Sequence, residues 1–366
     1  MSKTVFVGLS GGVDSAVSAA LLKEKGFNVV GVFIKIWQPE FIECTWARDR
    51  LDAMRVAVAL DIPFREIDLS SDYGRMVVEE MIASYASGIT PNPDVLCNRH
   101  IKFGSFMKYA LREGADYIAT GHYARVASGD RRLSQNGRRF TQKQSKTEFE
   151  LLRGRDKNKD QSYFLYTLGQ RDLARTIFPV GGLLKRHVRT LAQKWQLPVA
   201  QKSDSQGLCF VGDVSMKDFL SRYLKLESGP VLDSAGTVIG SHDGAALYTI
   251  GQRHGFTVER GAGDGKPHYV VSVDISANTI RVSPRREDAA RNEAPVDSMR
   301  WIGKAPELPF KATTQARYRE EPCSATITKA GTEIKIIFDE PQIAARGQSL
   351  VVYDGTRCLG GGVIAH

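Results

Sequence analysis

Gly8-Leu9-Ser10-Gly11-Gly12-Val13-Asp14-Ser15 is the stretch that decides the fold of this 366-residue chain. An apolar run from Val5 to Leu9 leads into it, and from Val13 onward apolar residues recur at helical spacing. The pattern predicts a strand, a glycine-rich turn and a helix. Such a turn suits phosphate, because its backbone N–H groups and the free N–H groups of the helix start can converge on an anion.

The composition of the turn indicates which phosphate it holds. Gly11 and Gly12 let the backbone bend sharply with no Cβ in the way, and Ser10 and Ser15 add hydroxyl donors. The lysine that a Walker P-loop places directly after its glycines is missing. The turn therefore suits pyrophosphate, and Asp14 can help to place Mg²⁺ or cap the helix. An ordinary strand–helix turn rich in small residues is the alternative interpretation.

This string resembles the pyrophosphate loop of the ATP pyrophosphatases, which cleave ATP between the α and β phosphates and leave AMP on a substrate atom. The resemblance implies ATP as a substrate, with Mg²⁺. It also assigns the whole loop to nucleotide binding: Gly8, Leu9, Ser10, Gly11, Gly12, Val13, Asp14 and Ser15. The group includes synthetases of small molecules and thiolases that place sulfur in tRNA, and the cysteines distinguish between these.

Five cysteines occur, at positions 44, 97, 209, 323 and 358, and none form a Cys-x-x-Cys pair, so we expect no metal site. The N-terminus runs directly into the first strand and no apolar run reaches 18 residues, which predicts a cytoplasmic protein without membrane contact. Its thiols are then expected to stay reduced unless chemistry uses them. A single cysteine is more often a small buried hydrophobe than a nucleophile, and we keep that interpretation for Cys44, Cys323 and Cys358.

The other two cysteines lie in polar loops. Cys97 follows Pro91-Asn92-Pro93-Asp94, which predicts a rigid loop before a helix that opens at Ile101-Lys102-Phe103. Cys209 lies in a glycine-containing stretch that begins at Lys202. A nearby helix N-terminus or cation favours the thiolate, which is the form that acts as a nucleophile or sulfur acceptor.

Both loops match the tRNA-specific 2-thiouridylases, the MnmA family, in which the motifs Asn-Pro-Asp-x-x-Cys-Asn and Gly-x-Cys-Phe each carry a catalytic cysteine. Further motifs of this family occur in the same order along the chain: Phe33 to Trp37, Thr120 to Arg125, Asn158 to Leu165, Tyr248 to Arg253 and Ala316 to Arg319. Several motifs in the right order are more specific than one. By this resemblance the chain is identified as a member of the family.

The resemblance implies a mechanism. ATP adenylates the C2 oxygen of the wobble uridine, position 34 of the tRNA, so that AMP becomes the leaving group. Sulfur from a persulfide on Cys209 then attacks C2, while Cys97 either closes a disulfide with Cys209 or frees hydrogen sulfide. The two thiols must come within disulfide reach, Cα to Cα under about 7 Å, so a loop has to move, and residues 203–207 are the better candidate.

The partners follow from the same resemblance. The persulfide comes from a cysteine desulfurase or a sulfur-relay protein, between which the sequence does not choose. The expected substrates are tRNAs for lysine, glutamate and glutamine, and the expected state of the enzyme is a monomer.

The resemblance also assigns contacts. Ile34, where the family commonly has methionine, and Gly121 are predicted to contact the nucleotide. Asn92, Pro93 and Asp94 are predicted to surround the target uridine, which must be extruded from the stacked loop before its C2 can be attacked. The remaining predicted tRNA contacts are His122, Lys159, Asp160, Gln161, Arg317, Tyr318 and Gln348. For a lone histidine, a packed or solvated side chain is the alternative interpretation.

Charge supports a polyanionic partner. Lys and Arg number 50 against 41 Asp and Glu, which gives a net charge of +9. Basic residues gather in 131–146 and in Lys185-Arg186-His187-Val188-Arg189, and each cluster is either a tRNA contact or a solvated face. The stretch 127–150 is longer than expected for the family and is predicted to be a hairpin that touches either the tRNA or nothing.

Length and pattern predict three domains. Residues 1–204 alternate short strands with helices, which is typical of a doubly wound parallel α/β sheet. One predicted helix runs from Ala47 to Leu60, with its apolar face at Ala47, Leu51, Met54 and Val58. Residues 205–284 are predicted to form a small mixed domain, and residues 285–366 a β-barrel that binds tRNA. Short strands are predicted there at 246–250, 269–274, 279–283, 325–328, 333–338 and 349–353.

Two other functions stay open on the residues alone. A ligase that adenylates a small molecule would keep the glycine-rich loop but would need neither paired cysteines nor a basic barrel. An RNA-binding module without catalysis is expected to have lost Asp14, Cys97 or Cys209, and all three are present.

Overall fold

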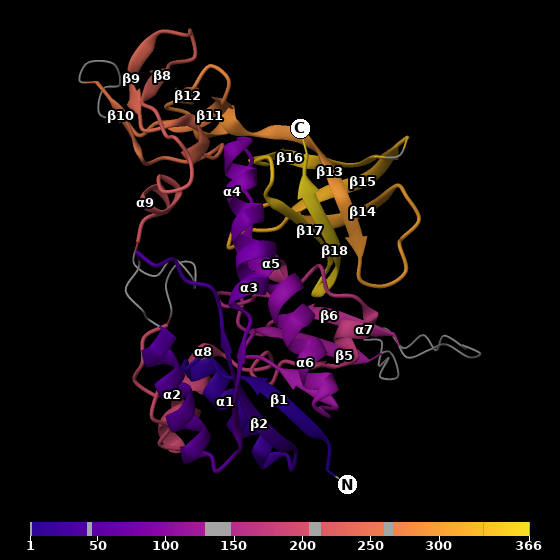
Figure 1. Ribbon diagram of the computed structural model, residues 1–366. Helices are drawn as coiled ribbons and strands as arrows, with labels where there is room; N and C mark the ends of the chain where they lie inside the picture. The colour runs from indigo at the N-terminus through magenta and orange to yellow at the C-terminus, as the bar shows by residue number, and fades with distance from the viewer. Residues whose placement is uncertain are drawn as a thin grey trace.

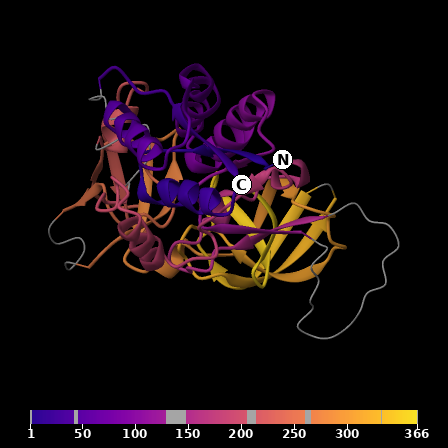
Figure 2. The same cartoon turned by 90° about the horizontal axis from the view of Figure 1, so that it is seen from below.

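A computed structural model describes residues 2–41, 46–128, 148–204, 214–259, 266–331 and 333–365. Within these ranges the strands form three sheets. Figure 1 shows the first sheet with its helices at the bottom, a small sheet at the upper left and a barrel at the upper right. Seen from below, the small sheet and the barrel lie on opposite sides of the molecule (Figure 2).

The first sheet is the predicted parallel α/β sheet. Its strands follow the order β3 (Phe64–Asp68), β2 (Asn28–Lys35), β1 (Thr4–Gly8), β4 (Tyr117–Ala119) and β7 (Thr176–Ile177). All neighbours pair in parallel. The strand order reverses between β1 and β4, and ligands of such sheets bind at the carboxyl ends of the strands beside the reversal. The glycine-rich loop leaves β1 at this point.

Helices cover both faces of this sheet. One face packs against α1 (Val13–Glu24), α2 (Trp46–Ala59) and α8 (Lys185–Lys194). The other face packs against two longer helical segments that each contain a π-helical stretch. The first comprises α3 (Ser70–Tyr73), η1 (Gly74–Val78) and α4 (Glu79–Ala86), and the second α5 (Pro93–Leu96), η2 (Cys97–Phe106) and α6 (Met107–Arg112).

The α2 helix forms where predicted, but the predicted apolar face is wrong. Val56 is fully buried with its neighbours Ala53 and Ala57, whereas Leu51 is 45% and Val58 80% exposed. The small alanines let the helix axis approach the sheet closely, so the face that contains them is the one that packs. Leu51 and Val58 lie on the opposite, outward side, and Met54 is partly buried between the two faces.

The helix that carries Cys97 begins earlier than predicted. It starts at Pro93 and not at Ile101, because Asn92 caps it: the Asn92 side-chain oxygen accepts a hydrogen bond from the Val95 backbone N–H at 3.3 Å. Proline at the first helical position has no N–H to lose there. Cys97 therefore lies one turn inside the helix and is 4% exposed.

The second sheet lies in the middle of the chain. It consists of β10 (Phe256–Val258), β9 (Val238–His242), β8 (Gly229–Leu232), β12 (Thr279–Ser283) and β11 (Tyr269–Asp274). The predictions for 269–274 and 279–283 are confirmed. The strand predicted at 246–250 is wrong: Ala245–Leu247 forms a 3₁₀ turn, η5, because Gly244 and Gly251, with φ of +137° and +84°, bend the chain on both sides.

The third sheet closes into the predicted C-terminal β-barrel. Its strands are β13 (Arg291–Trp301), β16 (Glu333–Gln342), β15 (Cys323–Ala330), β14 (Phe310–Gln315), β17 (Ser349–Asp354) and β18 (Arg357–Ile364). Antiparallel pairing of β13 with β18 closes the ring. The strands predicted at 325–328, 333–338 and 349–353 are confirmed.

A hairpin from the first part of the chain extends the barrel sheet. It consists of β5 (Ala124–Ser128) and β6 (Phe149–Arg153), and β6 pairs with β18 through Leu152 opposite Arg357. The ends of the hairpin predicted over 127–150 are therefore strands, and residues 129–147 lie outside the described residues. The shared sheet joins the barrel to the α/β part, and the domain boundaries at 204 and 284 stay predictions.

Four shorter helical elements lie between the strands. Two of them, η4 (Ser162–Phe164) and α7 (Gln170–Leu173), lie between β6 and β7. The other two are α9 (Met216–Leu220), which precedes β8, and η6 (Arg286–Ala289), which lies between β12 and β13.

Candidate active site

The glycine-rich loop has a shape that only glycine allows. Gly11 has a φ of +72°, and a Cβ there would lie 2.3 Å from the Asp49 carbonyl oxygen. Gly12 precedes the first turn of α1, and the Ser15 hydroxyl turns back to donate to the Gly12 carbonyl at 3.1 Å. The first turn of α1 therefore leaves backbone N–H groups at the loop, which is the arrangement that binds an anion.

Three neighbouring strands bring the predicted nucleotide contacts to one edge. Gly121 follows β4 and lies so close to α1 that a Cβ on it would be 2.8 Å from the Ser15 backbone nitrogen. Ile34, near the end of β2, has its Cδ1 atom 3.8 Å from where a Cβ on Gly8 would lie. The structure thus gathers Gly8, Ile34 and Gly121 beside the loop, and their contacts with a nucleotide stay predictions.

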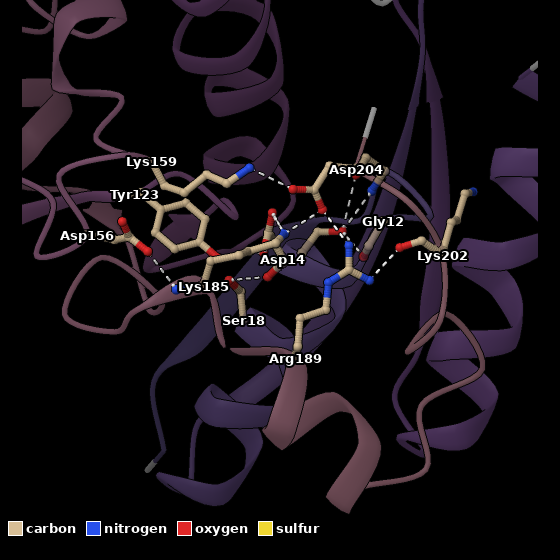
Figure 3. Close-up of polar contacts among 12 residues, drawn as sticks. Gly12, Asp14, Ser18, Tyr123, Asp156, Lys159, Lys185, Arg189, Lys202 and Asp204 are labelled. Carbon is tan, nitrogen blue, oxygen red and sulfur yellow. Dashed lines mark hydrogen bonds and ion pairs between the residues drawn. The ribbon is translucent and has the colours of Figure 1, made fainter. Parts of the chain in front are cut away.

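A cluster of charged side chains surrounds Asp14, the acidic residue in the first turn of α1 (Figure 3). The Lys185 ammonium donates to both Asp14 carboxylate oxygens at 2.8 Å, and the Tyr123 hydroxyl donates to Oδ1 at 2.7 Å. Burial and the Asp14 carboxylate raise the pKa of Tyr123 far above its usual value, so the phenol stays protonated and donates.

Asp204 is the second centre of this cluster. Its carboxylate is bound by Lys159 at 2.7 Å, Lys185 at 2.8 Å and Arg189 at 2.6 Å. Partial burial opposes its ionisation, but hydrogen bonds from Lys159 and Lys185 prevail and hold the pKa of Asp204 well below its usual range. Asp204 therefore stays ionised at any pH at which the enzyme works.

The sequence interpretation missed the roles of Tyr123, Lys185, Arg189 and Asp204 beside the loop. A signal was present for two of them, because Lys185 and Arg189 are four residues apart and so share one face of α8. That basic cluster was expected to face tRNA or solvent, and the structure instead turns these two side chains inward to Asp14 and Asp204. For Tyr123 and Asp204 only the folded chain reveals the contact.

The loop before Cys97 is held by two other parts of the molecule. The Gln348 amide of the barrel donates to the Thr90 carbonyl at 2.9 Å, and the Thr90 and Thr249 hydroxyls lie 2.7 Å apart. The structure thereby brings Gln348 to the residues that directly precede Asn92, Pro93 and Asp94. Further along the same helix, the Phe103 ring lies 6.0 Å from the His122 ring.

His122 is a packed side chain. It is 8% exposed, its ring lies against Phe103 and Phe178, and its Nδ1 is 2.7 Å from the Thr120 hydroxyl oxygen. Burial lowers its pKa well below the usual value, so the imidazole is neutral. Its predicted contact with tRNA stays untested, and it would need a donor or acceptor other than a charged ring.

Asp160 and Gln161 are engaged inside the protein. The Asp160 carboxylate accepts from Arg153 at 2.9 Å, from the Gly154 backbone at 2.8 Å and from both polar hydrogens of Ser162. The Gln161 side chain accepts from the Tyr123 backbone at 3.0 Å. The Asp160 side chain is therefore occupied within the protein, whereas Gln161 is partly exposed, and the tRNA contacts of this segment stay predictions.

Arg317 and Tyr318 lie between the barrel and η4. Arg317 is exposed, and the half-buried Tyr318 ring lies 4.5 Å from the Phe164 ring. Tyr318 thus packs against the segment that follows Gln161, so two of the predicted tRNA-contacting segments are neighbours. Cys209, Cys44 and the basic stretch 131–146 lie outside the described residues.

The parallel sheet, with a glycine-rich loop after its central strand, is the fold of the PP-loop ATPases. Profiles of three protein families match the chain: "tRNA methyl transferase HUP domain" over residues 3–213, "tRNA methyl transferase PRC-barrel domain" over 217–284 and "Aminomethyltransferase beta-barrel domain" over 291–364.

Curated relatives match over nearly their whole length. A protein of Verminephrobacter eiseniae called "tRNA-specific 2-thiouridylase MnmA" is 43% identical over 375 residues, covering 99% of this chain and 98% of its own. One of Streptococcus thermophilus with the same name is 41% identical over 372 residues, covering 99% and 95%. The chain belongs to the MnmA family of tRNA-specific 2-thiouridylases.

A solved structure of the U34-tRNA thiolase NcsA from Methanococcus maripaludis overlaps 60% of this chain and 63% of its own, with 17% identity and a TM-score of 0.35. In the described part of the chain, no helix has the length and apolar character needed to cross a membrane.

Proposed function

We propose that this chain adenylates the C2 oxygen of uridine 34 in tRNA with ATP and replaces that oxygen by sulfur, with release of AMP and pyrophosphate. The observation that supports this most is the path of one helical segment. It carries Cys97 near its start, and further along its Phe106 ring lies 3.8 Å from where a Cβ on Gly8 would be. The same segment thus connects a cysteine with the strand end that leads into the phosphate loop.

The proposed chemistry has three steps. The C2 oxygen attacks the α-phosphorus of ATP, and pyrophosphate leaves. The terminal sulfur of a Cys209 persulfide then attacks C2 and expels AMP. Attack of the Cys97 thiolate on the inner sulfur leaves 2-thiouridine and a Cys97–Cys209 disulfide, which a thiol reductant must open before the next cycle. In the variant in which Cys97 first frees hydrogen sulfide, the same disulfide forms.

The residues present fit a requirement for Mg²⁺. Magnesium is commonly held by one or two carboxylates together with substrate phosphates, and Asp14 offers a carboxylate at the phosphate loop. When bound, the ion would neutralise charge on the phosphates. Asp204 is a poorer candidate, since three cations already bind its carboxylate.

The tRNA is proposed to contact Asn92, Pro93, Asp94, His122, Lys159, Asp160, Gln161, Arg317, Tyr318 and Gln348. The net positive charge and the proximity of these segments support it. We further propose lysine, glutamate and glutamine tRNAs as substrates, a cysteine desulfurase or relay protein as sulfur donor, a monomeric enzyme and a cytoplasmic location.

The test is thiolation of an unmodified glutamate tRNA transcript with ATP, Mg²⁺ and a persulfide source, scored by retardation on a mercury-containing gel. The native chain is compared with Cys97→Ala, Cys209→Ala and the control Cys323→Ala. Product from the native chain and the control alone would support the reaction and the cysteine pair. Product from all four would contradict the cysteine roles, and product from none, with ATP still converted to AMP, would favour the small-molecule ligase.

A further inference from the structure

Three basic side chains meet where the helical segment that carries Cys97 packs against the barrel. Arg99 and His100 lie in η2, two and three residues after Cys97, and Arg300 lies in β13. Arg99 and Arg300 are exposed, and His100 is half-buried. None of the three belongs to the nucleotide site or to the segments proposed to contact tRNA.

The backbone of the barrel directs Arg300 towards this helical segment. In the antiparallel pair of β13 and β18, Arg300 lies opposite Gly361, so the two positions face the same side of the sheet. A Cβ on Gly361 would lie 2.9 Å from Cδ2 of the Tyr166 ring, which packs in one core with η2. The Asn98 side-chain amide of η2 also donates to the Phe164 carbonyl at 3.1 Å. Arg300 therefore lies on the side of the barrel against which η2 packs.

The three side chains have no anionic partner. In the part of the chain that the structure describes, none of them forms an ion pair or a hydrogen bond. Burial and, after it, the charge of Arg300 lower the pKa of Arg99, although Glu80 opposes this shift. Burial and the two guanidinium groups lower the pKa of His100. A bound anion would remove this repulsion, so the cluster has the electrostatics of an anion site.

Other arginines at the junctions of the barrel are paired. Arg153 bonds Asp160 at 2.9 Å, Arg286 bonds Glu320 at 2.7 Å, and Arg357 lies 3.5 Å from Glu150. An arginine that only joins two parts of the fold is expected to have such a carboxylate. Arg99 and Arg300 differ from these arginines, because the fold brings like charges together and leaves them uncompensated.

We propose that Arg99 and Arg300, with His100 as a further donor, bind one backbone phosphate of the tRNA. A guanidinium group presents a planar fork of N–H donors that matches two phosphate oxygens. Arg99 lies two residues after Cys97, roughly 3 Å further along the helix axis, so a phosphate close to the extruded uridine is within reach. The inference rests on the proposed use of tRNA and adds a contact outside the segments already proposed.

The experiment measures the affinity of the full chain for an unmodified glutamate tRNA transcript over a range of salt concentrations. The variants are Arg99→Gln, Arg300→Gln and the double variant, because glutamine keeps a polar side chain and removes the charge. The control is Arg112→Gln, which removes an equal charge from α6 at the end of the same helical segment, where Arg112 lies 3.7 Å from Glu113. The affinity for ATP is measured for every variant.

We expect each single variant to bind tRNA about 5- to 10-fold more weakly, with the slope of log Kd against log salt reduced by up to about 1. The double variant should lose less than the product of the two single losses and reduce the slope no further, because both arginines bind one phosphate. The affinity of the control for tRNA, and of every variant for ATP, should change less than about twofold.

Unchanged tRNA affinity in the variants, or an equal loss in the control, would overturn the site. If the tRNA affinity is unchanged but sulfur transfer from a protein donor slows, the occupant is an acidic protein and not tRNA. Losses that multiply fully in the double variant would contradict a shared phosphate. A native chain that shows the expected effects on tRNA binding but forms no 2-thiouridine would overturn the proposed function and leave the site standing, and a native chain that does not bind tRNA would overturn both.

Discussion

The phosphate loop and the loop before Cys97 both serve the same proposed reaction, but they are held in different ways. The phosphate loop is held by its own α/β part, through the close approach of Gly11 to Asp49, of Gly121 to Ser15, and through Lys185. The Cys97 loop is held from outside, by Thr249, which follows η5 in the middle part of the chain, and by Gln348 of the barrel.

This difference predicts that ATP binding and tRNA binding depend on different parts of the molecule. The nucleotide end is complete within one sheet and its helices, so it should bind ATP whatever the other two parts do. The loop before Cys97 depends on contacts with the middle part of the chain and with the barrel. Its position should therefore respond to what the barrel binds. Changes at the two loops should therefore separate ATP use from tRNA use.

The largest effect is expected from Gly121→Ala. A Cβ there would lie 2.8 Å from the Ser15 nitrogen and 2.9 Å from the Asp14 carbonyl carbon, which are backbone atoms that cannot turn away. A shift of the loop by a fraction of an ångström should lower kcat/KM for ATP by about 100-fold. Pyrophosphate release measures it. Gly182→Ala is the control, since no atom lies within 4 Å of the added methyl, and an equal loss there would contradict the explanation.

An intermediate effect is expected from Gln348→Ala. The variant loses the hydrogen bonds to the Thr90 and Pro91 carbonyls, at 2.9 and 3.4 Å. We expect the KM for tRNA to rise by about 10-fold, equivalent to about 1.4 kcal/mol, with the KM for ATP unchanged. Gln342→Ala, whose amide donates to Glu340 within the same barrel, is the matched control. An equal rise in the KM for tRNA and the KM for ATP would contradict the proposed separation of ATP use from tRNA use.

The smallest effect concerns pH and the buried His122. Its pKa is lowered in the folded state, so below the usual value of 6.5 the unfolded chain takes up a proton that the folded chain does not. The free energy of unfolding should therefore decrease as the pH falls, by about 0.7 kcal/mol between pH 7.0 and pH 6.0. Denaturant titration of His122→Asn should lack this part of the pH dependence, while the exposed His187→Asn should retain it. If the free energy of unfolding depends on pH equally in the native chain and in His122→Asn, the burial of a neutral imidazole is contradicted.

The α/β sheet, the phosphate loop and three of the six barrel strands, β15, β16 and β17, could be predicted because local periodicity and turn residues determine them. The buried face of α2 could not, because it depends on how closely small side chains such as Ala53 and Ala57 let the helix approach the sheet. The turn at Ala245–Leu247 was predicted as a strand, since its apolar residues carry no sign of the bends at Gly244 and Gly251.

The charged cluster at the phosphate loop could not be predicted from the sequence for a different reason. Lys185 and Asp204 come from positions 170 or more residues after the loop, and single-sequence patterns carry no information on such distant contacts. The same holds for the strand pairing between β6 and β18 that joins the α/β part to the barrel.

The central claim, that ATP use and sulfur transfer are carried out at separately held loops, is tested most directly with Cys97→Ser. Pyrophosphate and 2-thiouridine are measured in one reaction with tRNA, ATP and a persulfide source. We predict a tRNA-dependent burst of at least about one pyrophosphate per enzyme and no 2-thiouridine, since adenylation needs no thiol. Loss of the pyrophosphate burst together with thiolation, in a variant that still binds ATP and tRNA, would contradict the account.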